Sequence, residues 1–96
     1  MNRQEHLLTC LAEECAEVAQ RVSKALRFSL AEVQPGQPDS NAKRIAAELK
    51  DLISVVDMLE AEAVLQDCYP TLEERAKKVR KIEGFMEFAK FQGALT

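Results

Sequence analysis

Two pairs of carboxylates at helical spacing are the residues of this chain best suited to chemistry. Glu14 and Glu17 are three residues apart, and so are Glu48 and Asp51. Residues three apart in an α-helix lie on the same side of it, so each pair would present its two carboxylates together. If the two segments pack as neighbouring helices, four carboxylates converge. Their mutual repulsion then calls for a cation among them.

The residue types around these pairs favour a hard divalent cation. Mg²⁺ and Mn²⁺ prefer carboxylate oxygens, whereas a zinc site would need Cys and His ligands at short spacing. A di-iron carboxylate bundle would need two Glu-x-x-His motifs, but His6 is the only histidine and lies at least a helical turn from the carboxylates. The sequence also has no EF-hand loop, no glycine-rich phosphate loop and no nucleophile–histidine arrangement. We therefore expect Mg²⁺, with Mn²⁺ as a substitute.

Apolar periodicity predicts the two helices that carry the carboxylates. Apolar residues recur every three or four positions from about Gln4 to about Phe28, and again from about Asn41 to about Val64. The breaker-rich stretch between them predicts a loop with a turn over 29–40, in which Asp39 or Ser40 caps the second helix. Each acidic pair lies at the border of an apolar stripe, which is where a helix can present a ligand beside a core.

A third helix is predicted from Leu72 to about Lys90. Thr71 and Glu74 have the spacing of a capping box at its start, and Gly84 is an interior weakness of about 1 kcal/mol relative to Ala. The basic run on this helix is better explained as a solvated face than as a phosphate site. Its members are Lys77, Lys78, Arg80 and Lys81.

Length and composition indicate one all-α domain over residues 1–96. The chain is 47% hydrophobic with few aromatics, which suggests a helical bundle of about three main helices with an aliphatic core. Three helices leave one side of the two long aliphatic stripes uncovered, so we expect a homo-dimer or tetramer with a core like that of a four-helix bundle. The expected contact residues on the second helix are Ile53, Val56 and Leu59, with Asp57 at the rim.

Charge and cysteine usage limit the class of protein. A net charge of −3 is too small to indicate a nucleic-acid surface. Three cysteines, Cys10, Cys15 and Cys68, do not form a closed disulfide framework, and we expect them to be reduced and at least half-buried. No signal peptide or run of 18 apolar residues is present, so the expectation is a cytoplasmic protein with no membrane partner.

Either acidic pair taken alone is better explained as an exposed helix face. Glu is a strong helix former, and Arg21, Lys24 or Lys50 could supply ordinary salt bridges. The occurrence of two such pairs, each beside an apolar stripe and on consecutive long helices, is harder to explain in that way. The combination favours a metal site.

The same residues carry a resemblance to a known family. Glu13-Glu14-Cys15-Ala16-Glu17 and Glu48-Leu49-Lys50-Asp51 resemble the EExxE…ExxD motifs of the all-α nucleoside triphosphate pyrophosphohydrolases. That superfamily includes the MazG-like enzymes and the dimeric dUTPases. Ser23-Lys24-Ala25-Leu26-Arg27-Phe28 also looks MazG-like, and the resemblance covers roughly residues 5–65.

The resemblance implies hydrolysis of a nucleoside triphosphate, often a deoxynucleotide, to the monophosphate and pyrophosphate. It implies that Mg²⁺ is held by Glu14, Glu17, Glu48 and Asp51. Glu13 would be an accessory ligand through water or the group that orients the attacking water. Lys24 and Arg27 could contact the substrate phosphates. Lys24 is equally well explained as an exposed helix charge, and Arg27 is somewhat better explained in that way.

One alternative function remains open at this stage. The chain could be a non-catalytic helical oligomerisation or regulatory module that retains the acidic motif. Nothing in the sequence selects the base or the sugar of a substrate, and base contacts could come from the N-terminal stretch, the 29–40 loop or a second subunit.

Overall fold

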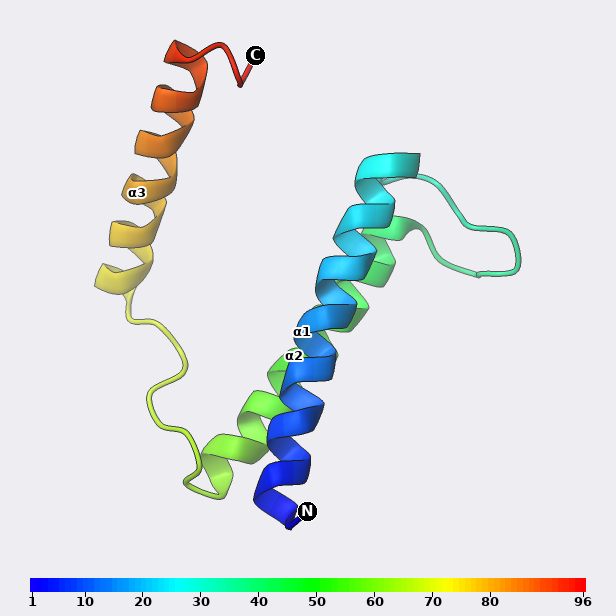
Figure 1. Cartoon of the computed structure of the whole chain (residues 1–96), viewed down its shortest axis with the longest axis vertical. Coiled ribbons are helices and arrows are strands. Elements are labelled where there is room, and N and C mark those ends of the chain that lie inside the picture. The colour runs from blue at the N-terminus through cyan, green and yellow to red at the C-terminus, as the bar shows by residue number, and fades with distance from the viewer. The chain divides into compact units, whose positions relative to one another are not determined.

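The computed structural model describes all 96 residues, and every regular element in it is an α-helix. Three helices follow one another, α1 (Arg3–Phe28), α2 (Asn41–Ala61) and α3 (Leu72–Phe91), as Figure 1 shows. The all-α class is confirmed. The bounds of α1 and α3 agree with the sequence to within one residue, whereas α2 ends at Ala61 and not near Val64.

The chain divides into two compact units, Met1–Gln66 and Asp67–Thr96. The first unit is a helical hairpin, here called the hairpin unit, and the second, here called the C-terminal unit, contains α3. The expectation of a single domain over residues 1–96 stays a prediction.

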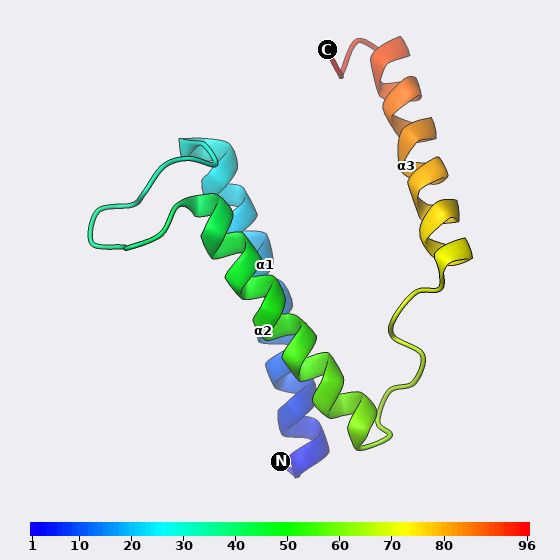
Figure 2. The ribbon, with the colours of Figure 1, turned by 180° about the vertical axis from the view of Figure 1, so that it is seen from behind.

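In the hairpin unit, α1 and α2 lie side by side and run in opposite directions. Figures 1 and 2 show both helices from opposite sides, with the 29–40 loop joining them at one end. Three hydrophobic residues are buried in this unit, Leu7 and Ala25 on α1 and Leu59 on α2. The small core identifies the face along which the two helices pack.

Side-chain caps start both hairpin helices. The Asn2 side chain accepts a hydrogen bond from the Glu5 backbone N–H at 2.8 Å, and Ser40 accepts one from the Lys43 N–H at 3.3 Å. These contacts satisfy backbone donors that have no partner within the helix. Of the two caps that the sequence allowed for α2, Ser40 is therefore the one used.

The early end of α2 has a local cause. Ala63 adopts a left-handed backbone conformation with φ of 57°. The Ala63 N–H donates to the Glu60 carbonyl at 3.0 Å, and the Val64 N–H donates to the Leu59 carbonyl at 2.9 Å. This is the Schellman arrangement that closes a helix. It ends the helix although the apolar pattern continues.

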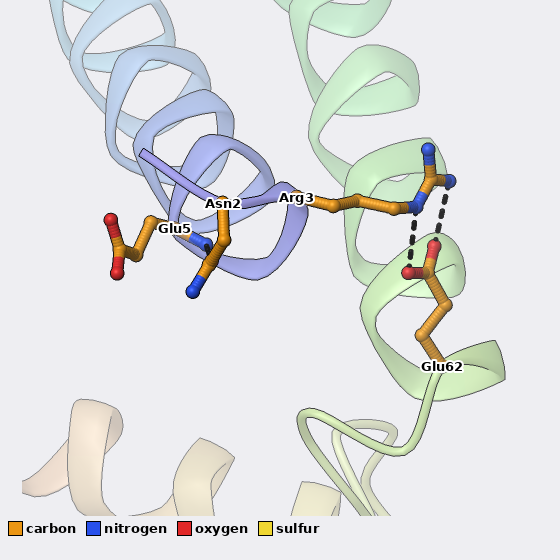
Figure 3. Close-up of polar contacts among 4 residues, drawn as sticks. All are labelled: Asn2, Arg3, Glu5 and Glu62. Atoms are coloured by element: carbon orange, nitrogen blue, oxygen red, sulfur yellow. Dashed lines mark hydrogen bonds and ion pairs between the residues drawn. The ribbon is translucent and has the colours of Figure 1, made fainter.

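An ion pair joins the two helices at the end of the hairpin opposite the loop. Arg3 Nε and Nη2 each lie 2.9 Å from an oxygen of the Glu62 carboxylate, as Figure 3 shows together with the Asn2 cap. The fork-to-fork geometry is the strong form of such a pair. Arg3 lowers the pKa of Glu62, chiefly through this hydrogen bonding, against the opposing effect of burial.

The C-terminal unit is built from local signals. Thr71 and Glu74 form the predicted capping box, since the Thr71 N–H donates to the Glu74 carboxylate and the Glu74 N–H donates to the Thr71 hydroxyl. Gly93, with φ of 75°, lies in the Schellman motif that ends α3. No residue of α3 is buried, and the basic run over 77–81 is exposed, as the sequence predicted.

Two further expectations about the whole chain meet different outcomes. No helix is both long and apolar enough to cross a membrane. None of the three cysteines forms a disulfide, but only Cys10 is half-buried, while Cys15 and Cys68 are exposed. The expectation that all three would be at least half-buried is wrong for these two, because neither lies on the face where α1 and α2 pack.

Candidate functional site

Three of the four predicted carboxylates converge between α1 and α2. Glu14 and Glu17 project from α1 and Glu48 from α2, and one carboxylate oxygen of each lies within 4.8 Å of the others. Glu14 and Glu48 are half-buried, whereas Glu17 is exposed. The packing of the hairpin thus makes one cluster of the two sequence motifs. We call Glu14, Glu17 and Glu48 the carboxylate cluster.

Glu48 lies where its ionised form is disfavoured. Its pKa is raised, first by a hydrogen bond with Glu17, next by burial, and then by the charges of Glu17, Asp51 and Glu14. Carboxylates this close repel one another, so a proton or a cation beside Glu48 would relieve the repulsion.

The pKa of Glu14 is raised by similar causes. Burial raises its pKa most, and the charges of Glu17, Asp51 and Glu13 raise it further. Charges that disfavour ionisation are typical of sites where a metal ion replaces the proton.

The Arg21 guanidinium lies at the edge of the carboxylate cluster but forms no hydrogen bond with it. Its Nε lies 3.8 Å from Glu48 Oε1, and both side chains are only about a fifth exposed, at 20% and 18%. This is an ion pair too long to be a hydrogen bond. Arg21 Nε and Nη1 are buried without a hydrogen-bond partner, and so are Glu14 Oε2 and Glu48 Oε2.

The unsatisfied oxygens make the cluster suitable for a hard cation. Buried polar atoms are nearly always hydrogen-bonded or metal-bound, so two orphaned carboxylate oxygens in one place call for an additional partner. Around an octahedral Mg²⁺ with bonds of about 2.0–2.1 Å, ligand oxygens lie roughly 3–4 Å apart. Oxygens within 4.8 Å of one another can reach that geometry through small side-chain rotations.

Asp51 and Glu13 lie at the periphery of the cluster. Neither belongs to the group whose oxygens approach within 4.8 Å. Asp51 is close enough to raise the pKa of both Glu14 and Glu48, and Glu13 raises that of Glu14. Both are exposed, and each could act on a ligand through a water molecule.

Lys24 and Arg27 form no ion pair with the carboxylate cluster. Lys24 is half-buried and lines a cavity with Phe28 and three loop residues. Arg27 is exposed, and its guanidinium carbon lies 4.8 Å from the centre of the Phe28 ring. Arg21 is the cation that the structure brings to the carboxylates, whereas the sequence suggested it only for an ordinary salt bridge.

Asn41 organises the 29–40 loop, and sequence reasoning missed it. It is 2% exposed, and its Nδ2 donates to the Ser29 carbonyl at 2.8 Å and to Glu32 Oε1 at 3.1 Å. Its backbone N–H donates to the Glu32 carbonyl, and the next N–H, that of Ala42, donates to Leu30. The only sequence signal was an amide residue directly after the Ser40 cap.

The rest of the loop is also ordered. The Gln37 N–H donates to the Gln34 carbonyl at 2.9 Å, and Gly36 has φ of 83°. Pro-Gly at the centre of such a bond is typical of a type II turn. Arg44 Nη1 donates to Gln34 Oε1 at 2.7 Å. The loop is therefore tied to α2 at both Asn41 and Arg44.

Compared with protein-family models, curated proteins and solved structures, the chain matches none of them. The similarity of its two acidic motifs to those of MazG-like enzymes therefore stays a prediction.

Proposed function

We propose that the hairpin unit is a Mg²⁺-dependent nucleoside triphosphate pyrophosphohydrolase. Its substrate would be a nucleoside or deoxynucleoside triphosphate, its products the monophosphate and pyrophosphate, and its role the cleaning of nucleotide pools. The observation that supports this most is the convergence of Glu14, Glu17 and Glu48 with two buried, unpartnered carboxylate oxygens.

The carboxylate cluster would hold the metal, with Asp51 completing the set directly or through water. Bound there, Mg²⁺ would supply charge to offset that of the phosphates and would lower the pKa of a bound water. The hydrolysis itself is a displacement at the α-phosphorus. Water oxygen forms the new bond, the bond to the bridging oxygen breaks, and pyrophosphate leaves.

The chain's own groups have separate tasks in that reaction. Glu13 lies beside Glu14 without joining the cluster, so it would orient the attacking water or hold an accessory water ligand. Arg21 has unpartnered N–H groups directed at no other acceptor, and it would bind a phosphate oxygen. Lys24, one turn further along α1, would add a second positive charge for the phosphates.

The direct test is pyrophosphate release from a panel of the common NTPs and dNTPs, with and without Mg²⁺. Release that requires Mg²⁺ and is lost in Glu48→Gln supports the proposal. A protein that binds Mg²⁺ but releases no pyrophosphate from any member would instead support the alternative of a non-catalytic module.

We also propose that the hairpin completes its core with a second copy, as a dimer or tetramer. Several large apolar side chains of the hairpin are 37–47% exposed, among them Leu8 and Val22 on α1 and Leu49 and Ile53 on α2. Leu8 and Val22 are fourteen residues apart, which is twice the seven-residue repeat of a helix–helix seam.

One residue expected in that contact is excluded. Leu59 is 0% exposed within a single copy, so it belongs to the hairpin's own core and cannot meet a partner. The sequence named Leu59 as a contact residue because it belongs to the apolar stripe of the second helix, but its side chain is covered within the hairpin itself. Light scattering at micromolar concentration tests the proposal. Ile53→Lys should give a monomer, while Leu26→Lys, at an 83% exposed position, should not.

A further inference from the structure

A cavity of about 250 Å³ lies where the loop meets the end of α1. Lys24 and Phe28 of α1 form one part of its wall, and Glu32, Gln34 and Pro35 of the loop form the rest. Pockets for drug-sized ligands measure about 300–1,000 Å³. This cavity therefore suits a single planar ring system and not a complete nucleotide.

The cavity lies in line with the carboxylate cluster along α1. Glu17, Arg21, Lys24 and Phe28 follow one another at four- and three-residue intervals, so they share one side of the helix. At 1.5 Å per residue, Lys24 and Phe28 lie about 10–16 Å beyond Glu17 along the axis. Helical side chains lean toward the N-terminus, which brings both back toward the carboxylates.

A nucleotide has the same order of parts along its length. The metal-bound phosphates of a substrate lie at one end, the base lies at the other, and the sugar separates them. With the phosphates at the carboxylate cluster, Arg21 and Lys24 are positioned along the phosphate chain. The base then reaches the cavity at the end of α1.

Phe28 offers the flat surface that a base would stack on. Its side chain is 47% exposed although it lines the cavity. The Arg27 guanidinium lies over the ring at 4.8 Å, and Arg27 is not part of the cavity wall. Arg27 thus holds the ring in place without filling the space beside it.

The loop supplies polar groups that are oriented before any ligand binds. Arg44 donates to Gln34 Oε1 at 2.7 Å, which leaves the Gln34 amide NH₂ as the donor available to a ligand. Asn41 donates to Glu32 Oε1 at 3.1 Å, so the second Glu32 oxygen remains an acceptor. A donor and an acceptor in one cavity match the edge of a nucleobase, which carries both.

We propose that this cavity is the base-recognition subsite of the hairpin. Phe28 is the surface on which the base stacks, and Gln34 and Glu32 form hydrogen bonds with the edge of the base. The inference rests on the proposed function for the identity of its ligand. It goes beyond that function by assigning base selection to the 29–40 loop, and not to the N-terminal stretch or a second subunit.

Two variants with matched controls separate the roles. Phe28→Leu removes the ring, and Phe91→Leu makes the same change at the last residue of α3. Gln34→Glu keeps the oxygen that Arg44 binds and replaces the donor NH₂, and Gln37→Glu adds the same charge in the same turn. All four positions tolerate the change sterically, because none of these side chains is buried.

The experiment measures calorimetric binding of dAMP, dCMP, dGMP and dTMP with Mg²⁺ present, together with pyrophosphate release from the four dNTPs. We expect Phe28→Leu to weaken binding of the preferred base about tenfold, the lower part of the range for losing a base–aromatic stack. Gln34→Glu should change the order of preference among bases. Both controls should behave as wild type.

The outcomes distinguish the subsite from the catalytic proposal. Base preference that persists unchanged in both cavity variants overturns the subsite while leaving the hydrolase intact. Preference that depends on Phe28 and Gln34 without any pyrophosphate release supports the subsite and refutes the hydrolase. Absence of both binding and turnover in the wild type overturns both.

Discussion

The two units of this chain differ in how they use their charges. The hairpin unit has eleven acidic and seven basic residues, a net charge of −4, whereas the C-terminal unit has five acidic and six basic residues, a net charge of +1. In the hairpin, three carboxylates have oxygens within 4.8 Å of one another, and two of the three, Glu14 and Glu48, each have a buried oxygen without a hydrogen-bond partner. In α3 the charged side chains are all exposed. Only in the hairpin would a bound metal ion relieve repulsion between neighbouring carboxylates.

The units differ equally in what specifies their helices. Both begin their helices with side-chain caps, but only the hairpin buries residues between helices. α3 exposes Phe85, Phe88 and Phe91 by 62%, 62% and 85%. Local signals are therefore sufficient to define a helix, while tertiary packing is what turns spaced carboxylates into a site.

The largest expected effect comes from removing the carboxylates of the hairpin. Glu14→Gln, Glu17→Gln, Glu48→Gln and Asp51→Asn should each lower turnover by about 100-fold or more, because each removes charge that positions Mg²⁺. Circular dichroism should show an intact fold. Without metal, the melting temperature should not fall, since repulsion is relieved.

A matched change in the other unit is the control. Glu87→Gln removes an exposed carboxylate from α3 and should leave turnover unchanged. Near-wild-type activity in any three of the four hairpin variants would contradict the site.

Metal binding should stabilise the protein through the hairpin only. At about 100 times the dissociation constant, Mg²⁺ should add about 2.7 kcal/mol to the free energy of unfolding. Thermal unfolding with and without Mg²⁺ measures the shift, which should vanish in Glu48→Gln and persist in Glu87→Gln. Equal shifts in both variants would mean non-specific surface binding.

Because the pKa of Glu48 is raised, protons compete for the site and the shift should grow as the pH rises.

Removing the Asn41 side chain should test whether the loop end of the hairpin is a fixed part of the structure. Asn41→Ala leaves the Ser29 carbonyl and Glu32 without their donor, at a position 2% exposed. The expected cost is about 1–3 kcal/mol in the free energy of unfolding, measured by denaturant titration. Ala42→Ser, at the exposed next position, is the control. A cost below that of the control would show that the loop is held by other contacts.

Asn41 also shows where sequence reasoning reached its limit. The helices and the capping box followed from periodicity and local hydrogen bonding, which act within a few residues. The convergence of Glu14 with Glu48 followed only from assuming that α1 and α2 pack together. The bonds from Asn41 to Ser29 and Glu32 depend on the path of the whole loop, and no local pattern encodes that path.

The C-terminal ends of α2 and α3 can also be compared, because each has a residue in the left-handed conformation. Ala63 and Gly93 occupy the same position in two Schellman motifs, with φ of 57° and 75°. A left-handed conformation costs a non-glycine residue about 1–2 kcal/mol. Glycine is the residue expected at such a position, whereas alanine at the end of α2 adopts the conformation at a steric cost.

Exchanging alanine and glycine at these two ends should therefore change stability in opposite directions. Ala63→Gly should stabilise the hairpin by about 1 kcal/mol, since glycine adopts the left-handed conformation without a Cβ clash. Gly93→Ala should destabilise the end of α3 by a similar amount. Denaturant unfolding measures the first and amide exchange near residue 90 measures the second. Destabilisation by Ala63→Gly would mean that the alanine methyl group contributes packing that outweighs its strain.

The smallest expected effect concerns the ion pair at the open end of the hairpin. The Arg3 side chain is 68% exposed and that of Glu62 is 33% exposed, so solvent and salt screen the pair. Because Arg3 lowers the pKa of Glu62 in the folded protein, the pair adds stability above the carboxylate's unfolded pKa. This stability is lost as the pH falls through the lowered pKa.

Glu62→Gln should lower the melting temperature slightly at pH 7, and the difference from wild type should disappear in strong acid or molar salt. Glu83→Gln, on exposed α3, should show no such pH-dependent difference. A Glu62→Gln difference that persists at low pH would assign the contribution of Glu62 to packing of its side chain and not to its charge.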